Sequence, residues 1–391
     1  MKKYNKITPE GTKDFIFEEC AARELAAEKL LSLFMGRGYN QVTTPGLEFL
    51  DVFGSLPLED MYKLTDPKGR LMVLRADTTL PMARVAATRL KNQPLPLRLC
   101  YKQNVYTVNR ALSGRSDEVF QAGVELIGSN SKRADLEVIL LAVEGLKRCE
   151  APDFKVEIGH AGFFKALSKE LCLNDEQLEE IRMLIELKNY AALKDYLSSL
   201  DNEAAKILYK LPRLFGSSEV FDNARGICRS DEALKILDYL KALYNDLCAV
   251  GLSDNIIVDM GLVQRNDYYT GVIFRGFMSG SGETVMSGGR YDKLLEHFGE
   301  DLEATGFGIN VDTLSKAGFD RKLLHKTPDV LVFGHDGYEA KAIVFANDLQ
   351  KKGLICETST NKSREEALEY AKGHGIKEVF FINDGVKSEK L

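Results

Sequence analysis

Two polar side chains on one predicted strand could bind a small polar ligand. Gln121 and Glu125 lie in the segment Glu118–Ile127, with Gly123 between them, and alternate residues of an extended chain share one face. An amide and a carboxylate beside a bare glycine would form the floor of a site for a ligand that carries N–H groups. The same pattern is typical of an ordinary hairpin with one face in water, and this stretch alone favours that second interpretation.

A second group of polar residues follows the short predicted strand Leu71–Leu74. The chain continues through Asp77 and Thr79 into a helix predicted at Pro81–Leu90. Aspartate and threonine both cap helices, so these two residues could simply cap the helix that follows.

Hydrophobic periodicity predicts the elements that would position these residues. The hairpin Pro96–Gly128 is predicted as two strands joined by a loop at Asn109–Asp117. Amphipathic helices are predicted on either side of it, at Glu18–Met35 and Arg133–Cys149. A strand is then predicted at Phe154–Gly159, and a meander of three strands at Ile256–Met260, Tyr268–Phe277 and Thr284–Ser287.

The remaining segments complete the expected organisation. Residues 161–251 are predicted to be mostly helical, with Asn174 and Ser230 as helix caps. The Gly-Gly-Arg-Tyr-Asp segment that ends at Asp292 is predicted to lead into a helix, and Thr305–Val311 is predicted as a strand followed by a helix. After Pro328, strands and helices alternate, which predicts a small α/β domain with a parallel or mixed sheet.

Composition narrows the class of protein. The chain has 391 residues and a net charge of -6, which allows two or three domains and gives no general attraction for nucleic acid. No apolar run is long enough for a membrane span, and the N-terminus does not have the pattern of a secretory signal. Seven scattered cysteines indicate reduced thiols in the cytoplasm. No motif for a metal, nucleotide or other cofactor is present, so none is expected.

Several short motifs occur in an order that resembles the histidyl-tRNA synthetase catalytic domain over roughly residues 7–320. They are Pro9–Asp14, Gly38-Tyr39 with Pro45 and Glu48, LRADTT at Leu74–Thr79, QAGVELIG at Gln121–Gly128, DYYTG at Asp267–Gly271, SGGRYD at Ser287–Asp292 and TGFGINVDTL at Thr305–Leu314.

This resemblance implies an α+β fold of the class II aminoacyl-tRNA synthetase type, with a mixed, mainly antiparallel sheet flanked by helices. The implied domains are a histidine-binding domain at 1–320, with a helical insertion at about 161–251, and a small α/β domain at 328–391. The small domain resembles a shortened anticodon-binding domain.

Four positions depart from the synthetase pattern where the resemblance places the ATP site. Thr107 and Gln264 replace arginines, Asn109 replaces an adenine-recognising glutamate, and Thr313 replaces the arginine at the far end of ATP. If each of the three lost arginine contacts is worth ~2 kcal/mol, their loss together weakens ATP binding by roughly four powers of ten. Arg265 lies one residue from the expected arginine and would point to the other face of a strand.

The amino-acid side of the implied site is better preserved. The resemblance assigns Asp77 and Thr79 to the α-ammonium group of histidine, and Gln121 and Glu125 to the pocket lining. It also assigns three aromatic side chains to the imidazole ring, namely Tyr268, Tyr269 and Tyr291. In a regular strand, Tyr268 and Tyr269 would face opposite ways, which predicts that only one of them touches the ligand.

A synthetase-like chain without its ATP contacts is similar to the regulatory subunits of ATP phosphoribosyltransferase. This similarity implies a non-catalytic subunit of histidine biosynthesis that assembles with a short-form catalytic subunit and binds L-histidine for feedback. A homodimer through the N-terminal helix and the Pro45 strand is implied as well. Two alternatives remain open: a divergent, active histidyl-tRNA synthetase, and a histidine-sensing protein with another partner. The tail, with nine Lys and Arg against eleven Asp and Glu over residues 328–391, disfavours tRNA binding.

Overall fold

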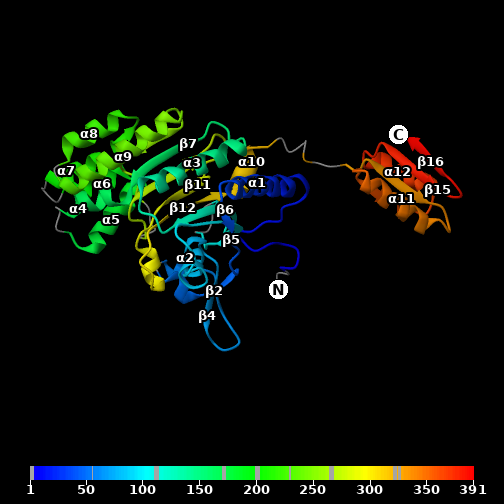
Figure 1. Ribbon diagram of the computed structural model, residues 1–391, viewed down its shortest axis with the longest axis horizontal. Coiled ribbons are helices and arrows are strands. Elements are labelled where there is room, and N and C mark those ends of the chain that lie inside the picture. The colour runs from blue at the N-terminus through cyan, green and yellow to red at the C-terminus, as the bar shows by residue number, and fades with distance from the viewer. Residues whose placement is uncertain are drawn as a thin grey trace. The chain divides into compact units, whose positions relative to one another are not determined.

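The computed structural model describes residues 4–54, 56–109, 114–169, 173–198, 203–228, 230–263, 268–319, 324 and 327–391. These residues form two compact units that divide after Phe319 (Figure 1). None of the helices described combines the length and the apolar character needed to cross a membrane.

The first unit is built on a nine-stranded sheet that is mainly antiparallel, as predicted. Only its β1–β5 and β7–β9 pairs are parallel. In spatial order the strands are β1 (Asn40–Gln41), β5 (Leu97–Tyr106), β6 (Glu118–Ile127), β12 (Ala304–Asn310), β11 (Met286–Arg290), β10 (Val272–Phe277), β7 (Lys155–His160), β9 (Ile256–Asp259) and β8 (Phe215–Gly216).

Helices α1 (Phe17–Gly36), α3 (Lys132–Arg148) and α10 (Val311–Ala317) cover one face of this sheet (Figure 1). Their apolar stripes pack against Ala122 and Val124 of β6, which are fully buried in the main core. Because side chains alternate along a strand, Gln121, Gly123 and Glu125 must point to the opposite face. Helix α2 (Thr79–Thr88) lies on that opposite side.

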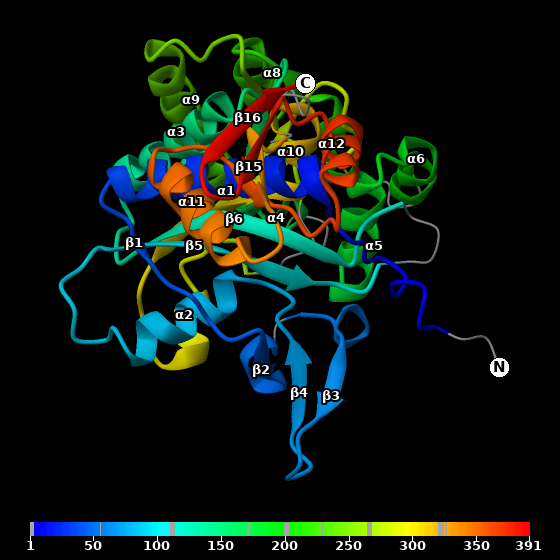
Figure 2. The ribbon, with the colours of Figure 1, turned by 90° about the vertical axis from the view of Figure 1, so that its right-hand side faces the viewer.

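A small sheet adjoins α2 and projects away from the main sheet (Figure 2). It consists of β2 (Leu47–Phe49), β4 (Leu71–Leu74) and β3 (Lys63–Thr65), with short 3-10 turns at Leu50–Phe53 and Leu58–Asp60. The buried Arg75, directly after β4, donates hydrogen bonds to the carbonyl oxygens of Thr44, Pro45 and Asn104. Arg75 thereby fixes the connection from β4 to α2 against β5.

Residues 161–251 are mostly helical, as predicted. The helices are α4 (Ala161–Ser168), α5 (Asp175–Glu186), α6 (Tyr190–Ser198), α7 (Glu203–Lys210), α8 (Glu219–Ile227) and α9 (Asp231–Ala249), with a 3-10 turn at Leu211–Arg213. Asn174 and Ser230 cap α5 and α9 through their side chains, which confirms both predicted caps.

The predicted meander is wrong in its pairing and in two boundaries. Strand β9 pairs with β7 and β8, whereas β10 pairs with β7 and β11. Strand β10 begins at Val272, so Tyr268 and Tyr269 lie outside it, and Arg290 is the last residue of strand β11. The segment after Arg290 leads into a 3-10 turn at Leu294–Phe298 rather than an α-helix. Apolar runs indicate strands, but they do not specify which strands become neighbours.

The second unit is a four-stranded sheet between two helices. Its strand order is β14 (Cys356–Thr358), β13 (Val330–Gly334), β15 (Glu378–Ile382) and β16 (Val386–Lys390), and only β16 is antiparallel to its neighbour. Helix α11 (Glu339–Lys351) packs on Val330 and Val332, and α12 (Arg364–Gly373) packs on Leu331 and Phe333. Strand β16 was not predicted, because it contains a single apolar residue.

Candidate ligand-binding site

Glycines on the α2 side of the main sheet allow neighbouring groups to approach the strands closely. Gly123 of β6 pairs with Gly308 of β12, and Glu125 pairs with Gly306. A Cβ atom on Gly306 would lie 1.8 Å from Oε2 of Glu125, so a side chain at this position is excluded. The absence of side chains here leaves space above the strands for the polar groups of their neighbours.

Glu125 is buried on this face of the sheet, with 1 % of its surface exposed. The interpretation of an ordinary hairpin with a wet outer face is therefore wrong for this residue. The hydroxyl of Thr79 donates to Oε1 of Glu125 at 2.9 Å, and the hydroxyl of Tyr291 donates to Oε2. Helix α2, strand β6 and the segment after β11 thus meet at one carboxylate.

Asp77 has the capping role considered for it. Its Oδ1 atom accepts a hydrogen bond from the backbone N–H of Leu80 at 2.9 Å, which caps the first turn of α2. A hydrogen bond from Tyr268 also stabilises its charged form. Thr79 makes no such cap, because its hydroxyl is directed to Glu125.

The three tyrosines form one aromatic cluster. The rings of Tyr268 and Tyr269 have centroids 4.7 Å apart, and those of Tyr268 and Tyr291 are 6.0 Å apart, edge to face. The prediction that Tyr268 and Tyr269 face opposite ways assumed a regular strand. It fails because both residues precede β10, where the chain does not alternate.

The two carboxyl groups of this cluster have raised pKa values. Burial raises the pKa of Glu125 to about 8, and the neighbouring charge of Asp77 adds to the rise. Burial likewise raises the pKa of Asp77 to about 6. A cation placed between them would favour the ionised form of both groups. The arrangement is therefore suited to bind an ammonium group.

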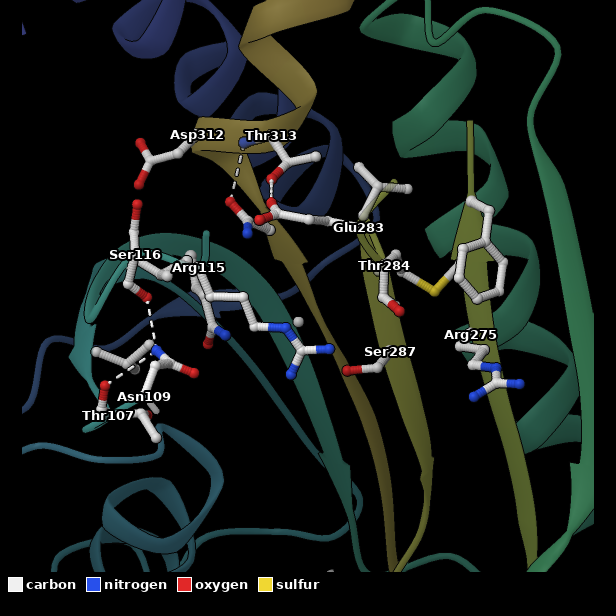
Figure 3. Close-up of a pocket in the computed structure, with 18 of the residues that line it drawn as sticks. Thr107, Asn109, Arg115, Ser116, Arg275, Glu283, Thr284, Ser287, Asp312 and Thr313 are labelled. Carbon is white, nitrogen blue, oxygen red and sulfur yellow. Dashed lines mark hydrogen bonds between the residues drawn. The ribbon is translucent and has the colours of Figure 1, made fainter. Parts of the chain in front are cut away.

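A cavity of about 600 Å³ opens beside this cluster. Asp77 and Gln121 line it together with Thr107, Asn109 and Thr313, so residues assigned to histidine share one cavity with three of the altered ATP positions. Figure 3 shows Thr107 and Asn109 on one wall and Thr313 with Glu283 on another.

The side chains of Asn109 and Thr313, at two of the altered positions, form hydrogen bonds with other groups of the protein. The Asn109 side-chain amide donates to the carbonyl oxygens of Thr107 and Ser116 and to the carboxylate of Asp117. The hydroxyl of Thr313 donates to Glu283 at 3.0 Å, so a carboxylate lies beside this neutral side chain. Gln264 and Arg265 lie outside the described residues, as does Arg110.

Sequence reasoning missed three cations that line the same cavity, namely Lys188, Arg275 and Lys316. Arg275 forms ion pairs with Glu157 at 2.6 Å and with Asp259 at 3.8 Å. Its sequence signal was a single charged residue in the otherwise apolar strand Val272–Phe277. The pairing with Glu157 could not be inferred, because it depends on the register of β10 against β7.

Comparison with known proteins agrees with this geometry. The family model for histidyl-tRNA synthetase matches residues 11–314. The ATP phosphoribosyltransferase regulatory subunit of Clostridium novyi (strain NT) is 39 % identical over 98 % of this chain and 94 % of its own length. That of Clostridium botulinum (strain Langeland) is 38 % identical over 100 % of this chain and 97 % of its own.

Among solved structures, an ATP phosphoribosyltransferase regulatory subunit/histidyl-tRNA synthetase from Bacillus halodurans C matches with a TM-score of 0.86 and 30 % identity. The match covers 97 % of this chain and 99 % of that one. The predicted class II synthetase-like fold is therefore confirmed. The chain belongs to the histidyl-tRNA synthetase-like family, within its group of ATP phosphoribosyltransferase regulatory subunits.

Proposed function

We propose that this chain is a non-catalytic regulatory subunit that binds L-histidine and assembles with a short-form ATP phosphoribosyltransferase catalytic subunit. In this role it supports transfer of a phosphoribosyl group to ATP by the partner and contributes to feedback by histidine. The observation that carries the proposal is an intact cluster of carboxylates and tyrosines beside ATP-site positions that now serve the protein's own structure.

The cluster has the chemistry that histidine requires. Asp77 and Glu125 would bind the α-ammonium group and an imidazole N–H, and Thr79 and Gln121 would complete the polar lining. The rings of Tyr268, Tyr269 and Tyr291 offer flat apolar surfaces for the imidazole ring. Because Glu125 carries no paired cation among the described residues, the ligand would supply the missing positive charge.

The altered positions support the absence of adenylation activity. Thr107 and Thr313 offer neutral hydroxyl groups, whereas binding of a triphosphate relies on charged and preferably forked donors. The side chain of Asn109 is used by its own loop. The Glu283 carboxylate beside Thr313 would repel a polyphosphate.

The same proposal covers partners and location. The core of the assembly is a homodimer formed through the N-terminal helix and the Pro45 strand, and the complex acts in the cytoplasm without tRNA. The domain at 328–391 is included as a shortened relative of an anticodon-binding domain. Its net charge of -2, from nine basic and eleven acidic residues, supports the absence of tRNA.

Mixing experiments test the function directly. The full chain is combined with a short-form catalytic subunit, the mass of the complex is measured, and formation of phosphoribosyl-ATP is followed with and without histidine. We expect a hetero-oligomer, higher activity than that of the catalytic subunit alone, and inhibition by histidine. Absence of association together with absence of any gain in activity would refute the proposal. Histidine binding without this association would instead favour a sensor with another partner.

One observation favours a second candidate, a divergent histidyl-tRNA synthetase. Arg115, Lys188, Arg275 and Lys316 all line the cavity, and such cations could contact phosphate groups. Arg275, however, is held by two carboxylates. Histidine-dependent exchange between ATP and pyrophosphate separates the candidates: the synthetase requires exchange, and the regulatory subunit predicts none.

A further inference from the structure

The α-carboxylate of the proposed histidine ligand needs a partner that the carboxylate and tyrosine cluster does not provide. Free histidine is a zwitterion, so its carboxylate lies on the same carbon atom as the ammonium group and must enter the site with it. A carboxylate withdrawn from water without a cation is strongly disfavoured. The three positions that the resemblance assigns to arginines hold Thr107, Gln264 and Thr313, and none of these side chains carries a charge.

We propose that Arg115 binds the α-carboxylate of histidine and so selects the free amino acid over analogues that lack this group. The inference rests on the proposed function. Arg115 lines the same cavity as Asp77 and Gln121. Figure 3 shows its guanidinium group extending into the middle of this cavity, toward Ser287.

The backbone that carries Arg115 is fixed on the side of the binding site. Asp117, two residues later, accepts hydrogen bonds from the hydroxyl of Tyr62 and the backbone N–H of Asn109, and its own N–H donates to Gly11 at 2.7 Å. Strand β6, which bears Gln121 and Glu125, begins at the next residue. Arg115 is therefore anchored directly beside the strand that forms the floor.

The other cations of the cavity are less suitable. Arg275 lies three strands from β6 in the order β6-β12-β11-β10, which is roughly 14 Å at the usual strand spacing. Lys316 belongs to α10, on the side of Thr313 and Glu283, and Lys188 follows α5 of the helical insertion. A guanidinium also presents two parallel donors to a carboxylate, whereas a lysine presents a point charge.

The test compares L-histidine with L-histidinol, in which a hydroxymethyl group replaces the carboxylate. Binding of both compounds to the full chain is measured by titration calorimetry. We expect the wild-type chain to bind histidine roughly 30-fold more tightly than histidinol. Arg115→Gln should lower the affinity for histidine by about the same factor and change that for histidinol less than about threefold. Arg115→Lys should restore part of the preference.

Lys188→Gln is the matched control, because it removes one positive charge from the wall of the same cavity. It should leave the preference for histidine over histidinol unchanged. The assignment is overturned if both glutamine variants lose the preference for histidine over histidinol equally, or if Arg115→Gln does not lose it. Histidine binding itself would still stand in either case. If the wild-type chain binds neither compound, the proposed ligand fails and the assignment fails with it. Because Arg115 is exposed, its variants should keep the wild-type melting temperature.

Discussion

Glu125 shows how a single residue links the site to the stability of the empty protein. Its pKa is raised to about 8 by burial, against 4.5 for the free side chain. Between these two values the folded state holds a proton that the unfolded state has released. The free energy of unfolding therefore falls as the pH rises through this window. The ligand-free protein is less stable at pH 8 because it keeps a carboxyl group that only a ligand can fully satisfy.

We therefore predict that Glu125→Gln stabilises the ligand-free chain at pH 8, by on the order of 2 kcal/mol or more, and that the gain shrinks toward pH 5. Urea unfolding at several pH values measures it. Glu137→Gln is the control of opposite sign, because hydrogen bonds from Arg98 and Tyr39 lower the pKa of Glu137. Replacing the Glu137 carboxylate should therefore destabilise the protein at pH 8. A gain for Glu125→Gln that does not vary with pH would contradict the raised pKa.

The same group predicts how histidine binding depends on pH. A positively charged ligand bound beside Glu125 favours its ionised form, which is the minor form below pH 8. Binding should therefore release up to one proton and become several-fold tighter between pH 7 and pH 8. Calorimetry in two buffers of different ionisation enthalpy detects the proton. In Glu125→Gln the difference between buffers should disappear. Affinity that falls over this range would exclude Glu125 as the ligand's counter-ion.

At the scale of elements, Arg75 holds the β4–α2 connection in place. Its guanidinium donates to backbone carbonyl groups on two segments, at Thr44, Pro45 and Asn104. A lysine keeps the charge but cannot span these acceptors. Because the connection carries Asp77, its position in the binding site depends on this side chain.

We predict that Arg75→Met lowers the free energy of unfolding by roughly 3–5 kcal/mol and also weakens histidine binding, because buried carbonyl groups lose their donors. Arg89→Met, at an exposed position just after α2, should change stability by less than about 0.5 kcal/mol. Urea unfolding and calorimetry on both variants provide the comparison. Equal effects of the two substitutions would show that Arg75 does not position the connection.

The elements also show what the sequence could and could not predict. Alternation identified the long strands β5 and β6, and with them the shared face of Gln121 and Glu125, because this pattern is local. The pairing of β9 with β7 was missed, since helices separate the two strands in the chain. The Arg275–Glu157 pair depends on the same long-range register. The aromatic cluster was identified by family resemblance, but its geometry comes from a segment that is not a strand.

In the whole molecule, the site lies entirely within the first unit. Every residue assigned to histidine precedes Phe319, and the second unit has cores of its own on both faces of its sheet. The cavity and the tyrosine cluster are therefore built from one folding unit. A substitution inside the cavity should alter ligand binding without removing surface that a partner could contact.

Asp77→Asn tests this separation in the assembled complex. Asparagine keeps the acceptor that caps α2, so the fold should be retained, whereas the negative charge for the histidine ammonium group is lost. We predict that the variant assembles with the catalytic subunit and supports its activity as the wild type does. Inhibition by histidine should require at least tenfold more of it, because a charged hydrogen bond is worth about 1.5–3 kcal/mol. Mass measurement reports assembly, and activity assays with increasing histidine report both activity and inhibition. Unchanged inhibition alongside lost histidine binding by the isolated chain would show that feedback acts through the partner, because the only altered group lies in this cavity.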